Sequence, residues 1–182
     1  MLDQYIPGTN IPYTGNDISG VIRTLIISTD GLTLSQVCRI TGLETSTIQN
    51  WVKRGYLFRP VKKKYYERHM SRILLISALR DCMKIEEIGD LMAGINGELE
   101  SEDDDIVSET SLYEYFCQSI HSLNEKNIYP ENIDAVIEKV LEGFSGNHKG
   151  RLICALRVMI YAYISGICMK YIKDNLEEMR SL

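Results

Sequence analysis

The sequence lacks the residue patterns from which disulfide frameworks and metal sites are built. Its five cysteines are an odd number, and no two of them form a C-x-x-C pair. The three histidines, His69, His121 and His148, do not have the spacing of metal ligands. These absences argue against a disulfide-rich secreted domain and a structural zinc site, and they favour a reducing compartment. We expect no metal and no other cofactor.

Signals for secretion and for catalysis are also missing. The first residues, MLDQYIPGTN, contain neither the basic segment nor the apolar core of a signal peptide, so we expect a cytoplasmic protein. No glycine-rich phosphate loop follows a strand-like run. The acidic pairs Glu86–Glu87 and Glu177–Glu178 are adjacent in sequence, so the two carboxylates of each pair point different ways on a helix. We therefore predict that the protein is not an enzyme.

Composition and charge indicate a folded protein with an uneven surface. Hydrophobic residues make up 45% of the 182 residues, which is enough to bury a core in one large domain or two small ones. The formal charge is −5, but the centre of the chain is basic. The acids gather behind it in the run ELESEDDD, residues 98–105, which predicts a solvated linker. A sharper alternative is that this run competes with DNA for the basic centre.

Residues 33–66 carry the clearest structural pattern. A short amphipathic helix is predicted by apolar residues at helical spacing: Leu34, Val37 and Ile40. Gly42 interrupts it, because glycine tolerates the left-handed turn between two crossing helices. A second helix over 44–54 has Ile48 and Trp51 on its apolar side and ends at Gly55. Two short helices joined by a tight glycine turn are typical of a helix-turn-helix.

Basic residues gather at the end of this helix pair and just beyond it. They are Lys53, Arg54, Arg59, Lys62, Lys63, Lys64, Arg68 and Arg72. Glu67 is the only acid in this segment, residues 53–72. In a chain that is acidic overall, such a concentration is a local feature. Beside a helix-turn-helix it indicates a site for phosphate groups. The alternative is a solvated lysine-rich turn.

The stretch TLSQVCRITGLETSTIQNWVKRGYL resembles the first two helices of MerR-type winged-helix regulators. The matching apolar, small and glycine positions are Leu34, Val37, Cys38, Ile40, Gly42, Leu43, Ile48, Trp51 and Gly55. The basic segment through Tyr65 resembles the wing of that family, and SRILLISALRDCMKIEEIGDLM resembles the helix pair that follows it. More closely, IQNWVKRGYL followed by VKKKYYERHMSRILLISALR is similar to a bacterial family catalogued only as a domain of unknown function, MerR-like in its N-terminal half. The resemblance covers roughly residues 32–92.

A helix-turn-helix of this kind implies that helix 44–54 enters a major groove while the basic segment 59–68 lies on the phosphate backbone. The candidates for reading base edges are Thr45, Ser46 and Gln49. The candidates for contacts nearer the backbone are Asn50, Lys53, Arg54, Arg59, Lys62, Lys63, Lys64 and Arg68. An alternative role for Thr45 and Ser46 is to cap the helix. The chain departs from the MerR pattern at Gln49, Asn50, Trp51 and Lys63, so the base preference of that family does not carry over.

The rest of the chain is predicted to be helical around this centre. Residues 1–16 are expected to form an extended arm, and Asp17 to cap a helix that packs beneath the helix-turn-helix. The apolar face of that helix comprises Ile18, Val21, Ile22, Leu25 and Ile26. Helices are also expected over 71–82, around 85–92, from 111, and from Pro130. The last helix, apolar almost all round from 152 to 169, predicts the buried centre of a bundle more than a membrane span, because Arg157 interrupts it.

Together these patterns predict an all-α protein, a winged helix-turn-helix with a short wing joined to a C-terminal helical bundle. The expected divisions are a DNA-binding domain at 1–95, an acidic linker at 96–109 and a bundle at 110–182. We expect a bacterial transcriptional regulator that binds double-stranded DNA as a homodimer. A small apolar effector is a further possible partner, beside Met159, Tyr161 and Tyr163, although core packing explains these side chains better. The alternative is a protein-interaction module, such as an anti-regulator that keeps the fold without affinity for DNA.

Overall fold

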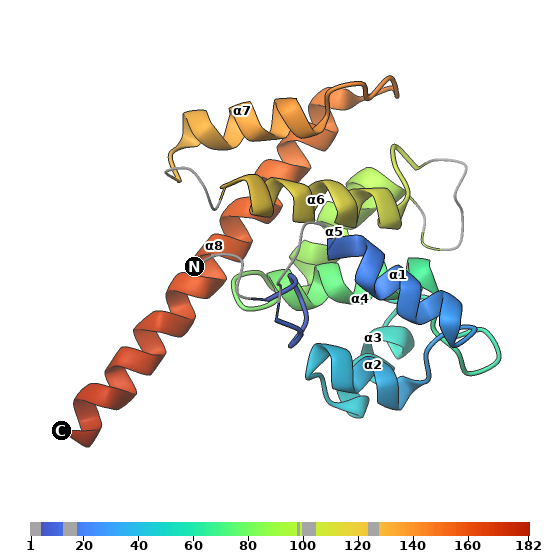
Figure 1. The fold of residues 1–182 in the computed structure, drawn as a ribbon, viewed down its shortest axis with the longest axis horizontal. Coiled ribbons are helices and arrows are strands. Elements are labelled where there is room, and N and C mark those ends of the chain that lie inside the picture. The colour runs from blue at the N-terminus through green and yellow to red at the C-terminus, as the bar shows by residue number, and fades with distance from the viewer. Residues whose placement is uncertain (1–4, 13–17, 98, 100–104, 124–127) are drawn as a thin grey trace.

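The computed structural model describes residues 5–12, 18–97, 99, 105–123 and 128–182. Within them the protein is all-α, with isolated β-bridges in place of extended strands. The helices are α1 (Ile18–Ser28), α2 (Leu34–Thr41), α3 (Thr45–Lys53), α4 (Glu67–Leu79), α5 (Ile85–Asn96), α6 (Glu109–Leu123), α7 (Pro130–Val140) and α8 (Lys149–Ser181) (Figure 1). The predicted all-α class is confirmed.

The two short helices at the predicted centre form as expected. Thr33 caps α2 in a reciprocal arrangement with Gln36, in which each side chain bonds the other residue's backbone N–H. Gly42 ends α2 at φ 71°, which confirms the left-handed turn. The N-cap of α3 is Glu44, without a side-chain hydrogen bond to the helix. The capping role considered for Thr45 and Ser46 is therefore wrong, because they are the first two residues of α3 itself.

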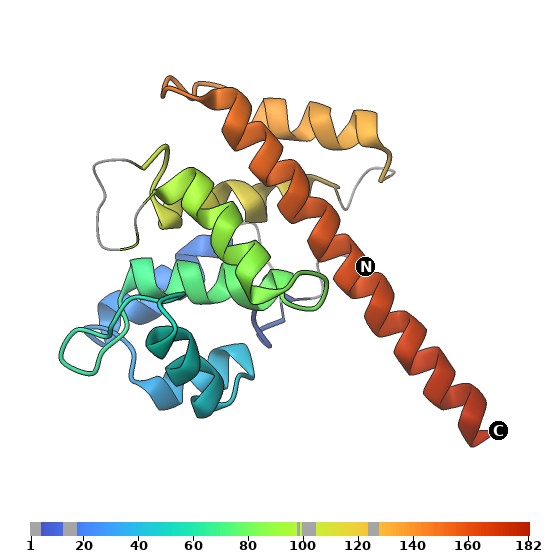
Figure 2. The ribbon, with the colours of Figure 1, turned by 180° about the vertical axis from the view of Figure 1, so that it is seen from behind.

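Helix α4 lies at the centre of the molecule, and α2, α5, α6 and α8 all contact it (Figures 1 and 2). Nearly every side chain from His69 to Leu79 is buried, which explains why this helix shows little amphipathic contrast. The buried apolar side chains of the described residues form one cluster that runs from Ile6 to Ala162. One hydrophobic core thus contains residues from before and after the predicted linker, 96–109. The division into three domains remains a prediction.

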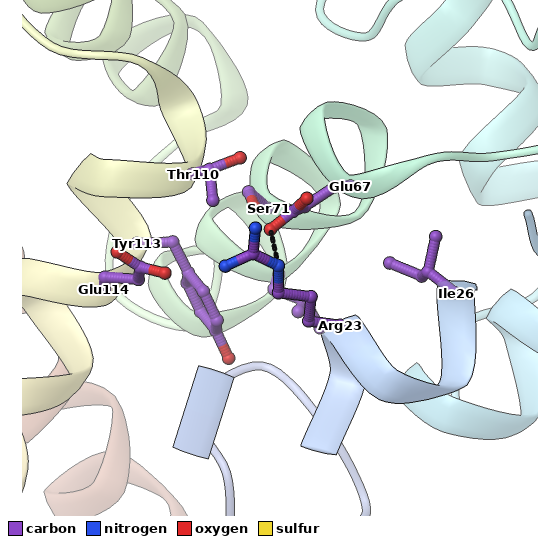
Figure 3. Close-up of a pocket in the computed structure, with 8 residues that line it drawn as sticks. Arg23, Ile26, Glu67, Ser71, Thr110, Tyr113 and Glu114 are labelled. Carbon is purple, nitrogen blue, oxygen red and sulfur yellow. Dashed lines mark ion pairs between the residues drawn. The ribbon is translucent and has the colours of Figure 1, made fainter. Parts of the chain in front are cut away.

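Helix α1 packs differently from the prediction. It contacts α6 instead of lying beneath α2 and α3, and Arg23 reaches Glu67 of α4 at 3.5 Å. Leu25, which was expected on the buried face, is exposed, whereas Ile26 is buried. A void of about 20 Å³ remains between α1, α4 and α6 (Figure 3). It has room for a single water molecule and not for an effector. The predicted cap, Asp17, lies outside the described residues.

The first described segment is a turn and not an extended arm. Tyr5 pairs with Pro12, and the backbone N–H of Ile6 donates to the carbonyl of Ile11 at 3.0 Å. The side chain of Ile6 is fully buried. Gly8, at φ 78°, lies so close to α4 that a Cβ atom there would meet the carbonyl oxygen of Leu74 at 2.2 Å. The turn is thus fixed by a glycine that no other residue can replace without moving the backbone.

Helix α8 has two different halves. Leu152, Leu156 and Ile160 are buried in the core, whereas every residue from 168 onward is exposed. The predicted long helix is confirmed, but its burial covers the first half only. Among the described residues α8 is the one helix long and apolar enough to cross a membrane, a weak indication because core helices of soluble proteins pass the same test. Arg157, which interrupts the apolar surface of this helix, donates a hydrogen bond to Asp134 of α7 at 2.7 Å.

Cysteine reactivity offers a direct test of this packing. Cys117 on α6 is buried, and burial raises the pKa of its thiol, whereas Cys82 and Cys154 are exposed. We expect a maleimide reagent to modify Cys82 and Cys154 in the folded protein and to modify Cys117 only after denaturation. Peptide mass spectrometry at successive times measures the three rates. Equal rates for Cys117 and Cys154 in the folded protein would contradict the packing of α6.

Candidate nucleic-acid interface

Helix α3 presents one polar face to solvent. Its exposed residues are Thr45, Ser46, Gln49, Asn50 and Lys53, at the spacing of a single helix face. Ile48 and Trp51 are buried on the opposite side, so the prediction that Trp51 belongs to the core is confirmed. The structure therefore places all five α3 side chains that were predicted to approach DNA on one accessible surface.

The segment after α3 forms a tight hairpin at the edge of the molecule (Figures 1 and 2). Val61 and Lys64 exchange backbone hydrogen bonds of 3.0 and 2.9 Å, which leaves Lys62 and Lys63 as the two turn residues. Both lysines have positive φ, 50° and 64°. This is the conformation of a type I′ turn, in which asparagine and glycine are the favoured residues. Two lysines there are strained, since a left-handed conformation costs an ordinary L-residue roughly 1–2 kcal/mol.

Backbone and side-chain bonds hold the base of this hairpin. Tyr65 exchanges two backbone hydrogen bonds of 2.8 Å with Leu32, which leads into α2. The backbone N–H of Tyr66 donates to Nδ1 of His69, so the Nε2–H of the same ring is free to donate to the carbonyl oxygen of Arg59 at 3.0 Å. His69, considered above only as a possible metal ligand, thus joins the two ends of the loop 59–66. The position of His69 in the first turn of α4, directly after this loop, is the sequence signal that could have suggested its role.

Helix α3 and the hairpin are the two sides of one concave surface. A hollow of about 370 Å³ between them is lined by Leu34, Gln49, Val52, Pro60, Lys63 and Tyr65. Its walls are mainly apolar, with an amide from α3 and an ammonium group from the hairpin at the polar positions. The structure therefore brings together a predicted base-reading residue, Gln49, and a predicted phosphate contact, Lys63.

Four of the predicted cations remain available on this surface. Lys53, Arg59, Lys62 and Lys63 are exposed, and none of them pairs with an acid in the part of the chain that the structure describes. Cations without a partner acid keep their full charge for a ligand. In a chain of net charge −5, this is a local positive surface beside α3.

Two other predicted cations already have partners. Arg54 donates to Glu86 of α5 at 2.6 Å and lies over the ring of Tyr56, and its hydrogen bond to the carboxylate of Glu86 raises the pKa of this arginine. Lys64 donates to the carbonyl oxygens of Thr29 and Gly31 at 3.2 and 3.0 Å, and so secures the end of α1. These bonds occupy part of the donor capacity of each side chain and hold its position, so both are less available to phosphate than the four exposed cations are.

Arg68 is removed from the predicted site. It donates to Glu109 of α6 at 2.7 Å, and its guanidinium group lies 4.1 Å from the centre of the Phe58 ring. Arg72, one helical turn later, donates to Glu109 at 3.1 Å and to the carbonyl oxygen of Tyr56 at 2.8 Å. The side chains of Arg68, Arg72 and Glu109 are 26%, 7% and 0% exposed. The three charges therefore form an internal cluster that joins α4 to α6.

Sequence reasoning missed this internal cluster for a physical reason. Two arginines four residues apart lie on one helix face, and an acid more than thirty residues away can meet both only after the chain has folded. Burial lowers the pKa of Arg72 in spite of the nearby carboxylate of Glu109. Most of the acidic run that was predicted to compete for the basic residues, 98 and 100–104, lies outside the described residues.

Two further properties of the described residues bear on chemistry. No group of three His, Cys, Asp or Glu side chains among them is placed to hold a metal ion. Around the position proposed for an effector, Met159 is buried, and the ring of Tyr163 packs edge-on against Phe116 with 5.6 Å between centroids. Met159 belongs to the core and Tyr163 packs against it, whereas Tyr161 is exposed, so core packing was the wrong explanation for Tyr161. An effector remains a prediction.

Comparison with known proteins places this surface within a family. The family described as "Domain of unknown function (DUF1836)" matches residues 22–116, which contain α2, α3, the hairpin and the internal charge cluster. The chain is 26% identical over 116 residues to the "Uncharacterized protein YkrK" of Bacillus subtilis (strain 168). The match covers 60% of this chain and 50% of that protein, so the chain spans about half the length of the curated relative it matches. No solved structure matches the chain.

Proposed function

The chain belongs to the DUF1836 family, and we propose that it is a cytoplasmic, DNA-binding transcriptional regulator of bacterial type. In this proposal α2 and α3 form a helix-turn-helix of the MerR-like winged class, and the hairpin at 61–64 is a short wing. The observation that carries the proposal is the set of four exposed cations without partner acids: Lys53 on the polar face of α3, and Arg59, Lys62 and Lys63 in the segment that follows it.

The dimensions and side chains of α3 suit a major groove. With its side chains an α-helix is about 10–12 Å wide, and the groove of B-DNA is about 12 Å wide. Thr45, Ser46 and Gln49 lie in the first turns of α3, where a recognition helix usually meets base edges. The amide of Gln49 can bond adenine in two places. Glu44, at the N-cap, would repel a phosphate at the end of α3, which favours an approach of its side face over an end-on approach.

The hairpin would then grip the DNA backbone. Lys62 and Lys63 are held at the tip of a turn whose base is secured to α2 and α4, so their positions relative to α3 are fixed. Lysine meets phosphate as a point charge and does not need the geometry of a bidentate contact. A homodimer belongs to the same proposal, because helix-turn-helix proteins commonly read two half-sites related by a two-fold axis.

Binding to a mixed-sequence duplex tests the proposal directly. We expect fluorescence anisotropy to show binding that weakens steeply with salt. Four phosphate contacts per chain correspond to a slope of about −3.6 in log K against log salt concentration, because each released counterion contributes about −0.9. Single-stranded DNA and an uncharged polymer serve as controls. Absence of binding at low salt would refute the regulator.

A protein-interaction module is the second candidate, and the apolar hollow beside α3 favours it. Leu34, Val52, Pro60 and Tyr65 give its walls the character of a surface that receives an apolar side chain of another protein. The partner acids of Arg54 and Arg68 also leave fewer cations for DNA than the sequence indicated. The same titration separates the two candidates, since a module of this kind gives no salt-dependent binding of duplex DNA.

A further inference from the structure

A polar hollow lies where the first described turn, residues 5–12, meets the end of α4 and the middle of α8 (Figures 1 and 2). Its volume is about 230 Å³, and its walls are mainly polar. A water molecule in the liquid occupies about 30 Å³, so the hollow has room for roughly seven groups of that size. It therefore suits a small molecule, since pockets for drug-sized ligands usually measure roughly 300–1,000 Å³.

Charged side chains of both signs line this hollow. Arg80 and Asp81 follow α4 directly, and Lys170 comes from α8. Among the residues that the structure describes, none of these three side chains has an ion-pair partner. Ser77, one helical turn before Asp81, adds a half-buried hydroxyl group. Two positive charges and one negative charge are therefore available to a ligand in the hollow.

Hydrogen bonds and a close backbone contact hold the wall formed by the first turn. The hydroxyl of Thr9 donates to the carbonyl oxygen of Ile6 at 2.9 Å. The backbone N–H of Asn10 donates to the carbonyl oxygen of Ile40 at 2.8 Å, near the end of α2. The close approach of Gly8 to α4 fixes the same turn from the other side. A wall that is ordered in advance lowers the entropic cost of binding a ligand.

A glycine of α8 sets the opposite wall. A Cβ atom on Gly166 would lie 3.3 Å from the Cβ atom of Asp81, so the lack of a side chain there lets α8 approach the end of α4 closely. Lys170 lies one helical turn further along α8, on the same face as Gly166. The carboxylate of Asp81 and the ammonium group of Lys170 thus reach one hollow from two different segments, without forming an ion pair with each other.

A small zwitterion matches these charges better than a simple anion or a simple cation. Its carboxylate can lie between Arg80 and Lys170, because both side chains are charged hydrogen-bond donors. Its ammonium group can lie against the carboxylate of Asp81, just beyond the end of α4, where the negative end of the helix dipole favours a positive charge. A simple anion would be repelled by Asp81, and a simple cation would be repelled by Arg80 and Lys170.

We propose that this hollow binds a free amino acid with a short side chain, whose carboxylate is held by Arg80 and Lys170 and whose ammonium group is held by Asp81. This ligand differs in class from the apolar effector predicted near Met159, because the walls of the hollow are polar. The site is separate from the polar face of α3, so it does not require that the protein bind DNA. An occupant joins α8 to the turn that is bonded to Ile40 of α2.

Thermal unfolding of the full-length chain in the presence of glycine, alanine, serine or threonine tests the site. We expect at least one of these amino acids to raise the Tm in a saturable manner, by about 3–6 °C at about ten times its Kd. Propionate and ethylamine each carry only one of the two charges, so they should give no saturable shift at the same concentrations. The absence of a saturable shift with all four amino acids, or an equal shift with propionate or ethylamine, overturns the proposal.

Substitutions that remove one charge locate the binding. Asp81→Asn and Lys170→Gln should each raise the Kd roughly tenfold or more, the effect of losing one charge-assisted hydrogen bond. Asp90→Asn on α5 and Lys173→Gln on α8 are the matched controls, because they make the same changes at positions that do not line the hollow. All four positions are exposed, so circular dichroism of each variant without ligand should match the parent. A parent-like Kd in either Asp81→Asn or Lys170→Gln refutes the assigned site.

Discussion

Replacement of Glu109 by glutamine is expected to lower the free energy of unfolding by about 3–5 kcal/mol, the usual effect when one partner of a buried ion pair is removed. The carboxylate is fully buried and accepts hydrogen bonds from Arg68 and Arg72. Glutamine keeps nearly the same shape but leaves the charge of Arg72, which is 7% exposed, without compensation. Chemical denaturation followed by circular dichroism measures the change.

Glu86→Gln is the matched control for this variant. It removes one carboxylate from one arginine, but Glu86 and Arg54 are both largely exposed. Solvent screens exposed pairs, so the control should have little effect on the free energy of unfolding. Equal effects of the two substitutions would contradict a buried cluster. A combined Arg68→Met, Arg72→Met and Glu109→Leu variant should recover part of the lost stability, because replacement of a whole buried charge cluster is often neutral or stabilising.

The internal charge cluster also controls where the proposed DNA-binding surface lies. Arg72 donates to the carbonyl oxygen of Tyr56, and Arg68 stacks on Phe58, so both arginines hold the segment that leads from α3 into the hairpin. Their charge partner is on α6, beyond the acidic run. The position of Lys62 and Lys63 relative to α3 thus depends on contacts with the C-terminal half. This link is a physical reason why the N-terminal region is not independent of α6.

The local parts of the fold could be predicted from the sequence. Gly42 and Gly55 mark the ends of α2 and α3, and the pattern of Val37, Ile48 and Trp51 defines their buried sides. These features depend on neighbours within one or two helical turns, so periodicity and glycine preference are sufficient to find them. The α8 helix was found for the same reason.

What could not be predicted depends on distant contacts. The position of α1 against α6 is set by which apolar faces meet after folding. A stripe of apolar residues in the sequence does not identify the helix that it packs against. The basic cluster showed the same limit, because sequence gives the charges but not their partners. Arg54 pairs with Glu86, Lys64 binds carbonyl groups at the end of α1, and Arg68 pairs with Glu109. The available cations are consequently half of those that surround the hairpin in sequence.

A hairpin in which Lys62→Asn and Lys63→Gly are combined should be more stable than the parent and bind DNA less well. Asparagine followed by glycine is the preferred pair in a type I′ turn, so the double variant should relieve the strain at φ 50° and 64°. The net gain should be about 1–2 kcal/mol, less than the strain of two lysines, because glycine loses more conformational freedom on folding. Loss of two phosphate contacts should reduce the salt slope by about 1.8. If the parent and the double variant bind DNA with equal affinity at about 1 M salt, this slope difference corresponds to a roughly 60-fold loss of affinity for the variant at about 0.1 M salt.

Opposite changes in stability and affinity distinguish a functional charge from a structural one. Asparagine and glycine would adopt this conformation with less strain than two lysines, so the strain favours a role for the two charges beyond the fold. The control is Lys139→Asn with Arg151→Gln, which removes the same charge from α7 and the start of α8, on the far side of the molecule from α3 (Figures 1 and 2). It should leave the salt slope unchanged. If the hairpin variant is stabilised but keeps the parent's affinity and slope, Lys62 and Lys63 do not contact DNA, and the short wing loses its proposed function.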